Sequence, residues 1–301
     1  MPSFRAGPVR VRVPATSANL GPGFDSAGLA LVLHDDVVVR VADRGLVVDV
    51  AGEGADDVAR VERNLVVRSL RAAFERLGGQ PRGLEVVCAN RIPHARGLGS
   101  SSAAIVAALV AARALVLGGE RLLDDDACLQ LATELEGHPD NVAACLRGGA
   151  TSAWQDAGRA GVVRHDVHPE LAPVAFVPPD RSSTAQVRGL LPATVPYADA
   201  VLNASRAALL PHALTTDPSL LLLATEDRLH QAYRAPAMPA TAALVAELRA
   251  QGVPAVVSGA GPTVLALTTR AGRPAVAVPR EGWTVLSLDV APSGAAVVPT
   301  A

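Results

Sequence analysis

The most restrictive feature of this 301-residue sequence is a long alanine-rich stretch, Ser100–Leu117, that is apolar almost all round. It ends at Gly118-Gly119, a pair typical of helix termination. A helix rises about 1.5 Å per residue, so one of this length can cross a small domain. Because the helix has no polar face, other elements have to surround it. The sequence therefore predicts a domain built around one buried helix.

The segment just before this helix has the composition of a phosphate-binding loop. It follows a predicted strand and reads Pro93-His94-Ala95-Arg96-Gly97-Leu98-Gly99-Ser100-Ser101-Ser102-Ala103. Its glycines permit backbone torsions and close approaches that a side chain would block. Serines in the first turn of a helix lie beside unpaired N–H groups and the positive end of the helix dipole, where anions bind. A glycine turn with a serine cap would look the same, so both interpretations stay open here.

All 27 basic residues are arginines, and the sequence contains no lysine. A Walker-type P-loop, a pyridoxal phosphate enzyme and a protein kinase each depend on a lysine, so these classes are excluded. A compositional bias explains the absence, since alanine, valine, arginine and glycine are abundant. Any phosphate site in this chain has to work without a lysine.

Charge and cysteine content predict a cytoplasmic protein that binds neither nucleic acid nor membranes. The formal net charge is −2, and the arginines are dispersed along the chain. The three cysteines are widely spaced without a C-x-x-C pattern, which indicates buried thiols in a reducing compartment. Residues 1–13 lack the apolar core of a signal peptide. The uncharged stretches 97–112 and 251–269 are too short, or too interrupted by glycine and proline, to span a bilayer.

Helical and strand-like patterns alternate irregularly along the chain, which favours an α+β fold over a doubly wound parallel sheet. Predicted strands cover residues 10–13, 36–41, 45–50, 84–89, 162–167, 174–178, 255–257, 264–268 and 284–288. Predicted helices cover residues 64–77, 100–117, 124–136, 199–210, 218–223 and 241–251. The pattern changes after Gly148-Gly149, so we predict two domains, residues 1–155 and 156–301.

Three further segments gather small, polar or ionisable residues. They are Pro14–Asp25 (PATSANLGPGFD), Glu134–Asn141 (ELEGHPDN) and Val257–Val264 (VSGAGPTV). Loops that a scaffold holds in place commonly carry recognition groups. An exposed turn, a solvated helix end and a structural connection between strands are the competing interpretations, and the residues alone leave them open.

Taken in order, these segments resemble the GHMP small-molecule kinases, named for galacto-, homoserine, mevalonate and phosphomevalonate kinases. Three motifs of that superfamily match: PATSANLGPGFD, GLGSSSA and SGAGPT. The stretches ATSANLGPGFDSAGLAL, ELEGHPDNVAACLRGG and DRLHQAYRAPAMP are similar to the branch that phosphorylates homoserine. The likeness extends from Val11 to the terminal APSGAAVV, which is nearly the whole chain.

The resemblance implies the GHMP kinase fold: an N-terminal α+β domain with the ATP loop, a ferredoxin-like C-terminal domain, and an active site in the cleft between them. It also implies phosphorylation of L-homoserine by ATP on the route to threonine, with a homodimer expected. The positions that it implies for ATP are Asn64, Pro93, Arg96, Gly97, Leu98, Gly99, Ser100, Ser101, Ser102 and Ala103. It places Mg²⁺ on Ser101 and Glu136, with Ser100 and Ser102 as alternatives to Ser101.

The substrate positions also carry over from the resemblance. They are Asn19, Asp25, His138, Asp140, Asn141, Thr184, Arg188, Arg234, Gly259 and Gly261. A carboxylate at Asp25 suits the cationic α-amino group of homoserine. The guanidinium forks of Arg188 and Arg234 suit its planar carboxylate.

Phosphoryl transfer needs in-line positioning and charge neutralisation more than covalent help. Some relatives pair an aspartate base with a lysine, which this chain lacks. The hypothesis is that Mg²⁺, the helix N-terminus and an oriented Asn141 carry catalysis without a dedicated base, with Asp140 as the reserve candidate for one. Two alternatives stay open: a GHMP kinase for a different small alcohol, such as mevalonate or a sugar, and a non-catalytic ligand-binding member of the fold.

Overall fold

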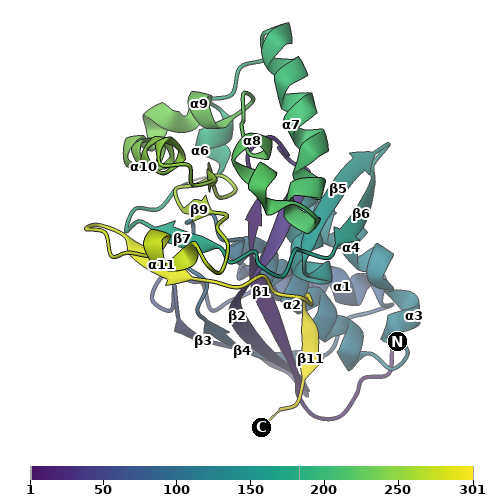
Figure 1. Ribbon diagram of the computed structural model, residues 1–301. Helices are drawn as coiled ribbons and strands as arrows, with labels where there is room; N and C mark the ends of the chain where they lie inside the picture. Colours follow the sequence, from purple (N-terminus) through teal and green to yellow (C-terminus); the bar gives the residue numbers. More distant parts are fainter. Residues whose placement is uncertain (1, 183, 301) are drawn as a thin grey trace.

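The computed structural model describes residues 2–182 and 184–300, which form two β-sheets with helices packed against them (Figure 1). The larger, seven-stranded sheet has the order β11-β1-β2-β4-β3, with β5 joined to β2 and β6 to β5. Among the strand pairs of this sheet in the described residues, only β3–β4 is parallel. The strands are β1 (Val9–Ala18), β2 (Ala27–Ala42), β3 (Gly45–Gly52), β4 (Gly83–Asn90), β5 (Ala150–Asp156), β6 (Arg159–His165) and β11 (Ala296–Val298).

The smaller sheet is antiparallel, with the order β10-β7-β9-β8. Its strands are β7 (Val174–Val177), β8 (Ala255–Val257), β9 (Val264–Ala266) and β10 (Thr284–Ser287). The helices are α1 (Leu65–Arg76), α2 (Ser100–Leu115), α3 (Gly119–Leu122), α4 (Asp125–Glu136), α5 (Asp140–Arg147), α6 (Thr184–Arg188), α7 (Tyr197–Thr215), α8 (Leu221–Ala224), α9 (Gln231–Arg234), α10 (Pro239–Ala250) and α11 (Arg273–Val276), with 3₁₀ turns at Pro218–Leu220 and Ala235–Ala237. The predicted α+β class is confirmed.

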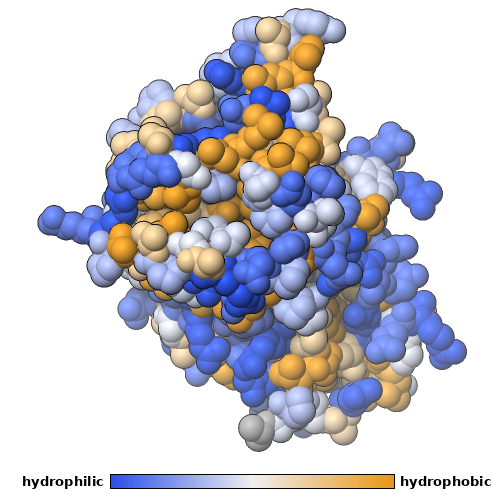
Figure 2. Space-filling view, in the orientation of Figure 1, coloured by the Kyte–Doolittle hydropathy of each residue, from blue (hydrophilic) through white to orange (hydrophobic). Residues whose placement is uncertain are grey.

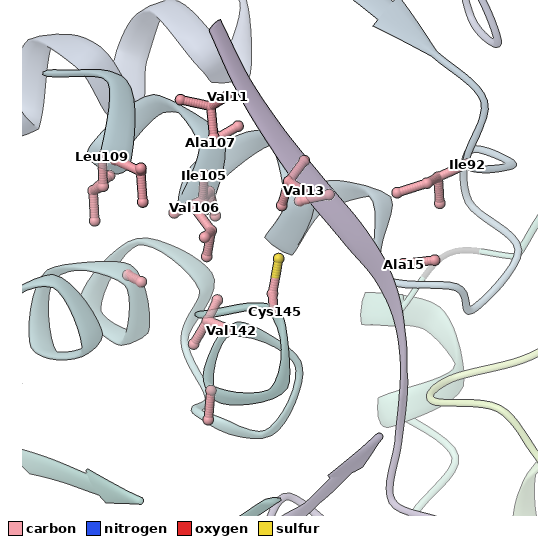
Figure 3. Packing of buried hydrophobic residues seen from close by; sticks show 14 of the residues in the cluster. Val11, Val13, Ala15, Ile92, Ile105, Val106, Ala107, Leu109, Val142 and Cys145 are labelled. Atoms are coloured by element: carbon pink, nitrogen blue, oxygen red, sulfur yellow. The ribbon is translucent and has the colours of Figure 1, made fainter. Parts of the chain in front are cut away.

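Helix α2 is the buried helix that the sequence predicts. Its Ile105 and Leu109 are fully buried, and α2 packs against β1, α1, α4 and α5. Figure 3 shows its side chains beside Val11 and Val13 of β1 and Val142 of α5. On the α5 side lies Cys145, where burial raises the pKa of the thiol well above its usual value. Because the body of α2 is packed on these elements, the position of its N-terminus, with the serines, is fixed relative to the larger sheet.

The two predicted domains share strands. Strands β6 and β11 follow residue 155 in the sequence, yet β6 pairs with β5 and β11 pairs with β1 in the larger sheet. Figure 1 shows the C-terminal strand beside the N-terminal one. The division at residue 155 stays a prediction, and sheet pairing crosses it in both places.

The first motif is strand over more of its length than the sequence predicts. Strand β1 continues past Val13 to Ala18, with a register shift against β2 between Pro14 and Ala15. A proline has no N–H to donate to the ladder and is tolerated at such an irregularity. Thr16 is consequently held in a sheet, and Asn19 begins the loop that follows.

The surface seen in Figure 2 is mostly polar over its lower half, and apolar side chains gather over α7 and α8 near the top. Tyr197 and Val201 of α7 are among the exposed apolar residues. Across residues 2–182 and 184–300, every helix is too short or too polar to cross a membrane.

Candidate active site

A polar cavity of about 270 Å³ brings the four sequence segments together. Its lining includes most of the predicted substrate positions: Asn19, Asp25, His138, Asp140, Asn141, Arg188, Arg234, Gly259 and Gly261, together with Ala95, Gly97, Gly99, Ser100, Ser101, Glu136, Ser182 and Ala260. Thr184 is the first residue of α6, but its side chain lies outside the part that the structure describes. Residues as distant in sequence as Asn19 and Gly261 thus face one space.

A second, apolar cavity of about 230 Å³ adjoins the polar cavity at Ser100 and Ser101, which line both. Its other lining residues are mainly aliphatic: Val37, Val50, Val58, Leu65, Val66, Cys88, Ala103 and Ala104, with Asp35, Asn64, Asn90 and His94. An apolar slot with a few polar groups suits a flat heterocycle. The start of α2 therefore lies between an apolar cavity and a polar one.

Close backbone packing holds the phosphate loop. Gly97 and Gly99 have φ values of +79° and +71°. A Cβ on Gly97 would lie 2.3 Å from the carbonyl oxygen of Ser258, and one on Gly99 would lie 1.9 Å from Oγ1 of Thr16. Only glycine fits at either position, so the loop is clamped between β1 and the SGAGPT loop.

Four predicted ATP-loop residues line neither cavity. Leu98 and Ser102 are buried beneath the loop. Arg96 points away, where Nε and Nη2 donate to two proline carbonyls just after β7, at 2.9 and 2.8 Å, and Pro93 lies beside the same hollow. These contacts tie the loop to the smaller sheet. Asn64 lines the apolar cavity, but its Oδ1 caps α1 by accepting from the N–H groups of Val66 and Val67.

Glu136, the last residue of α4, lies against the serines of the loop. Its Oε1 accepts hydrogen bonds from Ser101 Oγ at 2.6 Å and from Ser102 Oγ at 2.9 Å. Mg²⁺ typically takes one or two protein oxygens and completes its octahedron with waters and substrate phosphates. The Glu136 carboxylate and the Ser101 hydroxyl beside the loop match that coordination pattern. No cluster of three or more His, Cys, Asp or Glu suited to a metal occurs within the described ranges, so protein groups alone would not enclose an ion here.

Helix α5, a two-turn helix that presents Asp140 and Asn141 at its first turn, was not predicted from the sequence. Asp140 is buried, and its Oδ1 accepts from the backbone N–H of Asn141 at 2.7 Å and contacts Nδ1 of His138. Burial opposes a charge on His138, but the hydrogen bond to Asp140 and nearby carboxylates outweigh it and raise the pKa of the imidazole. Asp140 is thus held by an imidazole whose charged form it stabilises.

Thr16 is a site residue that the sequence reasoning missed, although it lies inside the first motif. Its Oγ1 donates to Oδ1 of Asn141 at 2.8 Å, across 125 positions of sequence. Thr16 is fully buried, and its N–H donates to the carbonyl of Leu98 in the loop. Because Oδ1 of Asn141 is occupied from behind, Nδ2 is the end of the amide that is available to the cavity.

We expect Thr16→Val to lower kcat about tenfold, because losing one hydrogen bond frees the Asn141 amide to turn. Thr16→Ser keeps the hydroxyl and should stay close to the wild type. Thr151→Val is a matched control, since the buried Thr151 hydroxyl has no hydrogen-bond partner among the described residues. Steady-state kinetics check this, and an equal loss in Thr16→Val and Thr16→Ser would contradict it.

Two arginines also line the polar cavity, and they differ in their partners: one forms an ion pair with a carboxylate and the other does not. Arg188 pairs with Asp25 through two hydrogen bonds, of 3.0 and 2.7 Å. Arg234 is only 2% exposed, and its Nε has no hydrogen-bond partner in the described part of the chain. Burial, and then repulsion from Arg188, lower the pKa of Arg234. A buried guanidinium without a carboxylate partner favours the binding of an anion.

Asn19 holds this end of the cavity together. Its Oδ1 accepts from the backbone N–H of Asp25 at 2.9 Å, and its Nδ2 donates to the carbonyl of Gly259 at 2.9 Å. Asn19 and Asp25 both have positive φ, of 68° and 55°, which Asn and Asp tolerate better than most residues. The amide of Asn19 therefore fixes the position of the Asp25 backbone relative to the SGAGPT loop.

Comparison with known proteins places this geometry in a family. The model of the GHMP kinases N terminal domain matches residues 64–149, and that of the GHMP kinases C terminal domain matches residues 212–278. A homoserine kinase of Streptomyces avermitilis is 63% identical over all of this chain and 99% of its own length. One from Rhodococcus erythropolis is 51% identical over 94% of each chain. The crystal structure of homoserine kinase from Cytophaga hutchinsonii superimposes with a TM-score of 0.81 at 26% identity, covering 98% of this chain and 99% of that one.

Proposed function

Because the chain belongs to the homoserine kinase family of GHMP kinases, we propose that it transfers the terminal phosphoryl group of ATP to the side-chain hydroxyl of L-homoserine. The product is O-phospho-L-homoserine, on the route to threonine. We place the enzyme in the cytoplasm, and a homodimer is expected from the family.

The observation that carries this proposal is the meeting of the two cavities at Ser100 and Ser101. Adenine fits the apolar cavity, and the amino acid fits the polar one. The phosphates then lie between them, at the N-terminus of α2, where backbone N–H groups and the helix dipole favour negative charge. This site needs no lysine.

The charges at the far end of the polar cavity match a zwitterion. The guanidinium of Arg234, which has no carboxylate partner among the described residues, suits a carboxylate, and Asp25 suits an ammonium group. In the structure Asp25 is paired with Arg188, so a bound zwitterion exchanges one ion pair for two. Mevalonate and sugars carry no ammonium group, so they would leave Asp25 without a new partner.

Ser101 and Glu136 are the residues that would hold Mg²⁺, with Ser102 on the same carboxylate oxygen. When bound, the ion neutralises charge on the phosphate oxygens. The chain's own residues supply the rest. The loop amides hold the phosphates, and Asn141 Nδ2 donates toward the reacting oxygens.

We expect Asp140→Asn to lower kcat by much less than the ~10²–10⁴ that removal of a general base costs. The reason is that Oδ1 of Asp140 is already engaged by the Asn141 N–H and by His138, so it is not free to take a proton from the substrate hydroxyl. The measurement is kcat and the KM for homoserine, with a melting curve to control for folding. A loss above about 10³ in kcat with unchanged KM would establish Asp140 as the base.

The test of the proposed function is a coupled assay of ADP release with four alcohols: homoserine, threonine, mevalonate and galactose. We expect homoserine to have the highest kcat/KM. Faster turnover of mevalonate or galactose would favour a different GHMP kinase. Release of no ADP with any alcohol would favour a ligand-binding member of the fold.

A further inference from the structure

His230 is fully buried behind the polar cavity and does not line it. It precedes α9, the short helix that ends with Arg234. Its ring lies 5.1 Å, between centroids, from the ring of Phe24, and the guanidinium of Arg234 lies 5.2 Å from that same ring. The three side chains form one packed group directly beneath the end of the cavity that carries the charges.

The hydrogen bonds of His230 define its protonation. Nε2 lies 2.9 Å from the carbonyl oxygen of Gly21, which can only accept, so Nε2 carries the proton. Nδ1 lies 3.2 Å from Nη1 of Arg234, which can only donate, so Nδ1 is the acceptor. The imidazole is therefore neutral. Burial, together with the charge of Arg234, lowers the pKa of His230 against the opposing effect of Asp227.

The backbone around His230 is fixed from both sides. The buried carboxylate of Asp227 accepts the N–H groups of Leu229, His230 and Gln231, at 2.9, 3.2 and 2.8 Å. On the other side, Gly21, whose carbonyl accepts from the ring, packs closely on the backbone of Thr225: a Cβ on Gly21 would lie 2.5 Å from the carbonyl oxygen of Thr225. The ring of His230 cannot turn without losing one of its two hydrogen bonds.

Resting on the proposed function, we propose that His230 is a positioning residue for the substrate carboxylate, acting through Arg234. Its Nδ1, with the carbonyl of Gly259 at 3.4 Å, occupies Nη1 of the guanidinium. That leaves the Nε–Nη2 edge of the fork for the anion, and Nε, although buried, has no partner among the described residues. A bidentate carboxylate contact needs the fork at one angle, and the neutral histidine sets that angle without adding a competing charge.

Two substitutions separate the two hydrogen bonds of the ring. His230→Asn can place Oδ1 where Nδ1 was, and so keeps an acceptor for Arg234. His230→Gln can place Nε2 near the original Nε2, and so keeps the donor to Gly21 but loses the acceptor. Both variants delete the ring, so they control for each other in stability. The control away from the cavity is His165→Gln. His165 is a half-buried histidine of β6 that is hydrogen-bonded to Ser152.

We expect His230→Gln to raise the KM for homoserine by about 10-fold to 100-fold, the range for a hydrogen bond to a charged group. The kcat and the KM for ATP should stay within about threefold of the wild type, a range too small to indicate loss of a transition-state contact. His230→Asn should keep most of the affinity for homoserine. With 3-aminopropan-1-ol (aminopropanol below), the analogue of homoserine that lacks the carboxylate, kcat/KM should be the same in the wild type and in both His230 variants.

Equal KM values for homoserine in the Asn and Gln variants would overturn the proposal, and so would a parallel loss with aminopropanol. Arg234→Gln is measured beside them. If it leaves the KM for homoserine unchanged, the carboxylate is bound elsewhere and the role of His230 falls with it. Failure of the proposed function gives a different result, because the wild-type enzyme would then not phosphorylate homoserine.

Discussion

Gly99→Ala is expected to lower kcat/KM for homoserine by at least about 10²–10³, the scale for misplaced catalytic groups and lost anion-binding donors. A Cβ at this position would meet Thr16 Oγ1 at 1.9 Å and Asn141 Oδ1 at 3.3 Å. The loop would have to move from the start of α2, and the Thr16–Asn141 hydrogen bond would open. One methyl group thus disturbs both the phosphate site and the amide that faces the acceptor.

Gly252→Ala is the matched control for this variant. Gly252 has a φ of +79°, close to that of Gly99, but a Cβ there would find no atom within 4 Å. A residue with a side chain pays a similar backbone penalty of about 1–2 kcal/mol in this region at either position. The melting temperature of Gly252→Ala should therefore fall by this backbone penalty alone and that of Gly99→Ala by at least as much, and only Gly99→Ala should lose activity. An active Gly99→Ala enzyme would show that the loop does not hold the phosphates.

Glu136→Gln should lower kcat by about 10²–10³ at ordinary Mg²⁺ concentration, because metal charge stabilisation contributes several kcal/mol. The amide still accepts a hydrogen bond from Ser101, but it no longer carries the charge that attracts the ion. Higher Mg²⁺ should recover part of the loss. Activity measured against Mg²⁺ concentration checks this directly.

Glu134→Gln provides the comparison on the same helix. Glu134 forms an ion pair with Arg76 at 2.8 Å on the exposed side of α4 and does not line the polar cavity. Its Mg²⁺ dependence should match that of the wild type. If Glu136→Gln shows the same Mg²⁺ dependence as Glu134→Gln, Glu136 does not belong to a metal site.

The local parts of the fold could be predicted from the sequence. Helix α2 was predicted to begin at Ser100, where it does, because its glycines, serines and apolar run are local signals. Helix α1 (Leu65–Arg76) lies within the predicted range 64–77, and Asn64 is its N-cap. Helix α5 was not predicted, since it is short and follows a Gly-His-Pro stretch that resembles a loop. The return of β11 to β1 could not be predicted either, because pairing across the whole chain leaves no local pattern.

For the site, too, some features could be predicted from the sequence and others could not. Motif resemblance identified residues that the structure brings into one cavity, from Asn19 to Gly261. It could not reveal how their side chains pair. The bonding of Arg188 to Asp25, and the supporting positions of Thr16 and His230, depend on contacts between distant segments. A motif indicates which residues are present, but only packing shows which atoms of each residue are free.

The central claim is that the polar cavity selects a zwitterionic alcohol. It is tested most directly by kcat/KM of the wild-type enzyme for homoserine, for aminopropanol, which lacks the carboxylate, and for γ-hydroxybutyrate, which lacks the ammonium group. We predict that each analogue is at least about 100-fold poorer than homoserine, because each leaves a charged group of the cavity without its partner. Turnover of either analogue within about tenfold of homoserine would contradict the account.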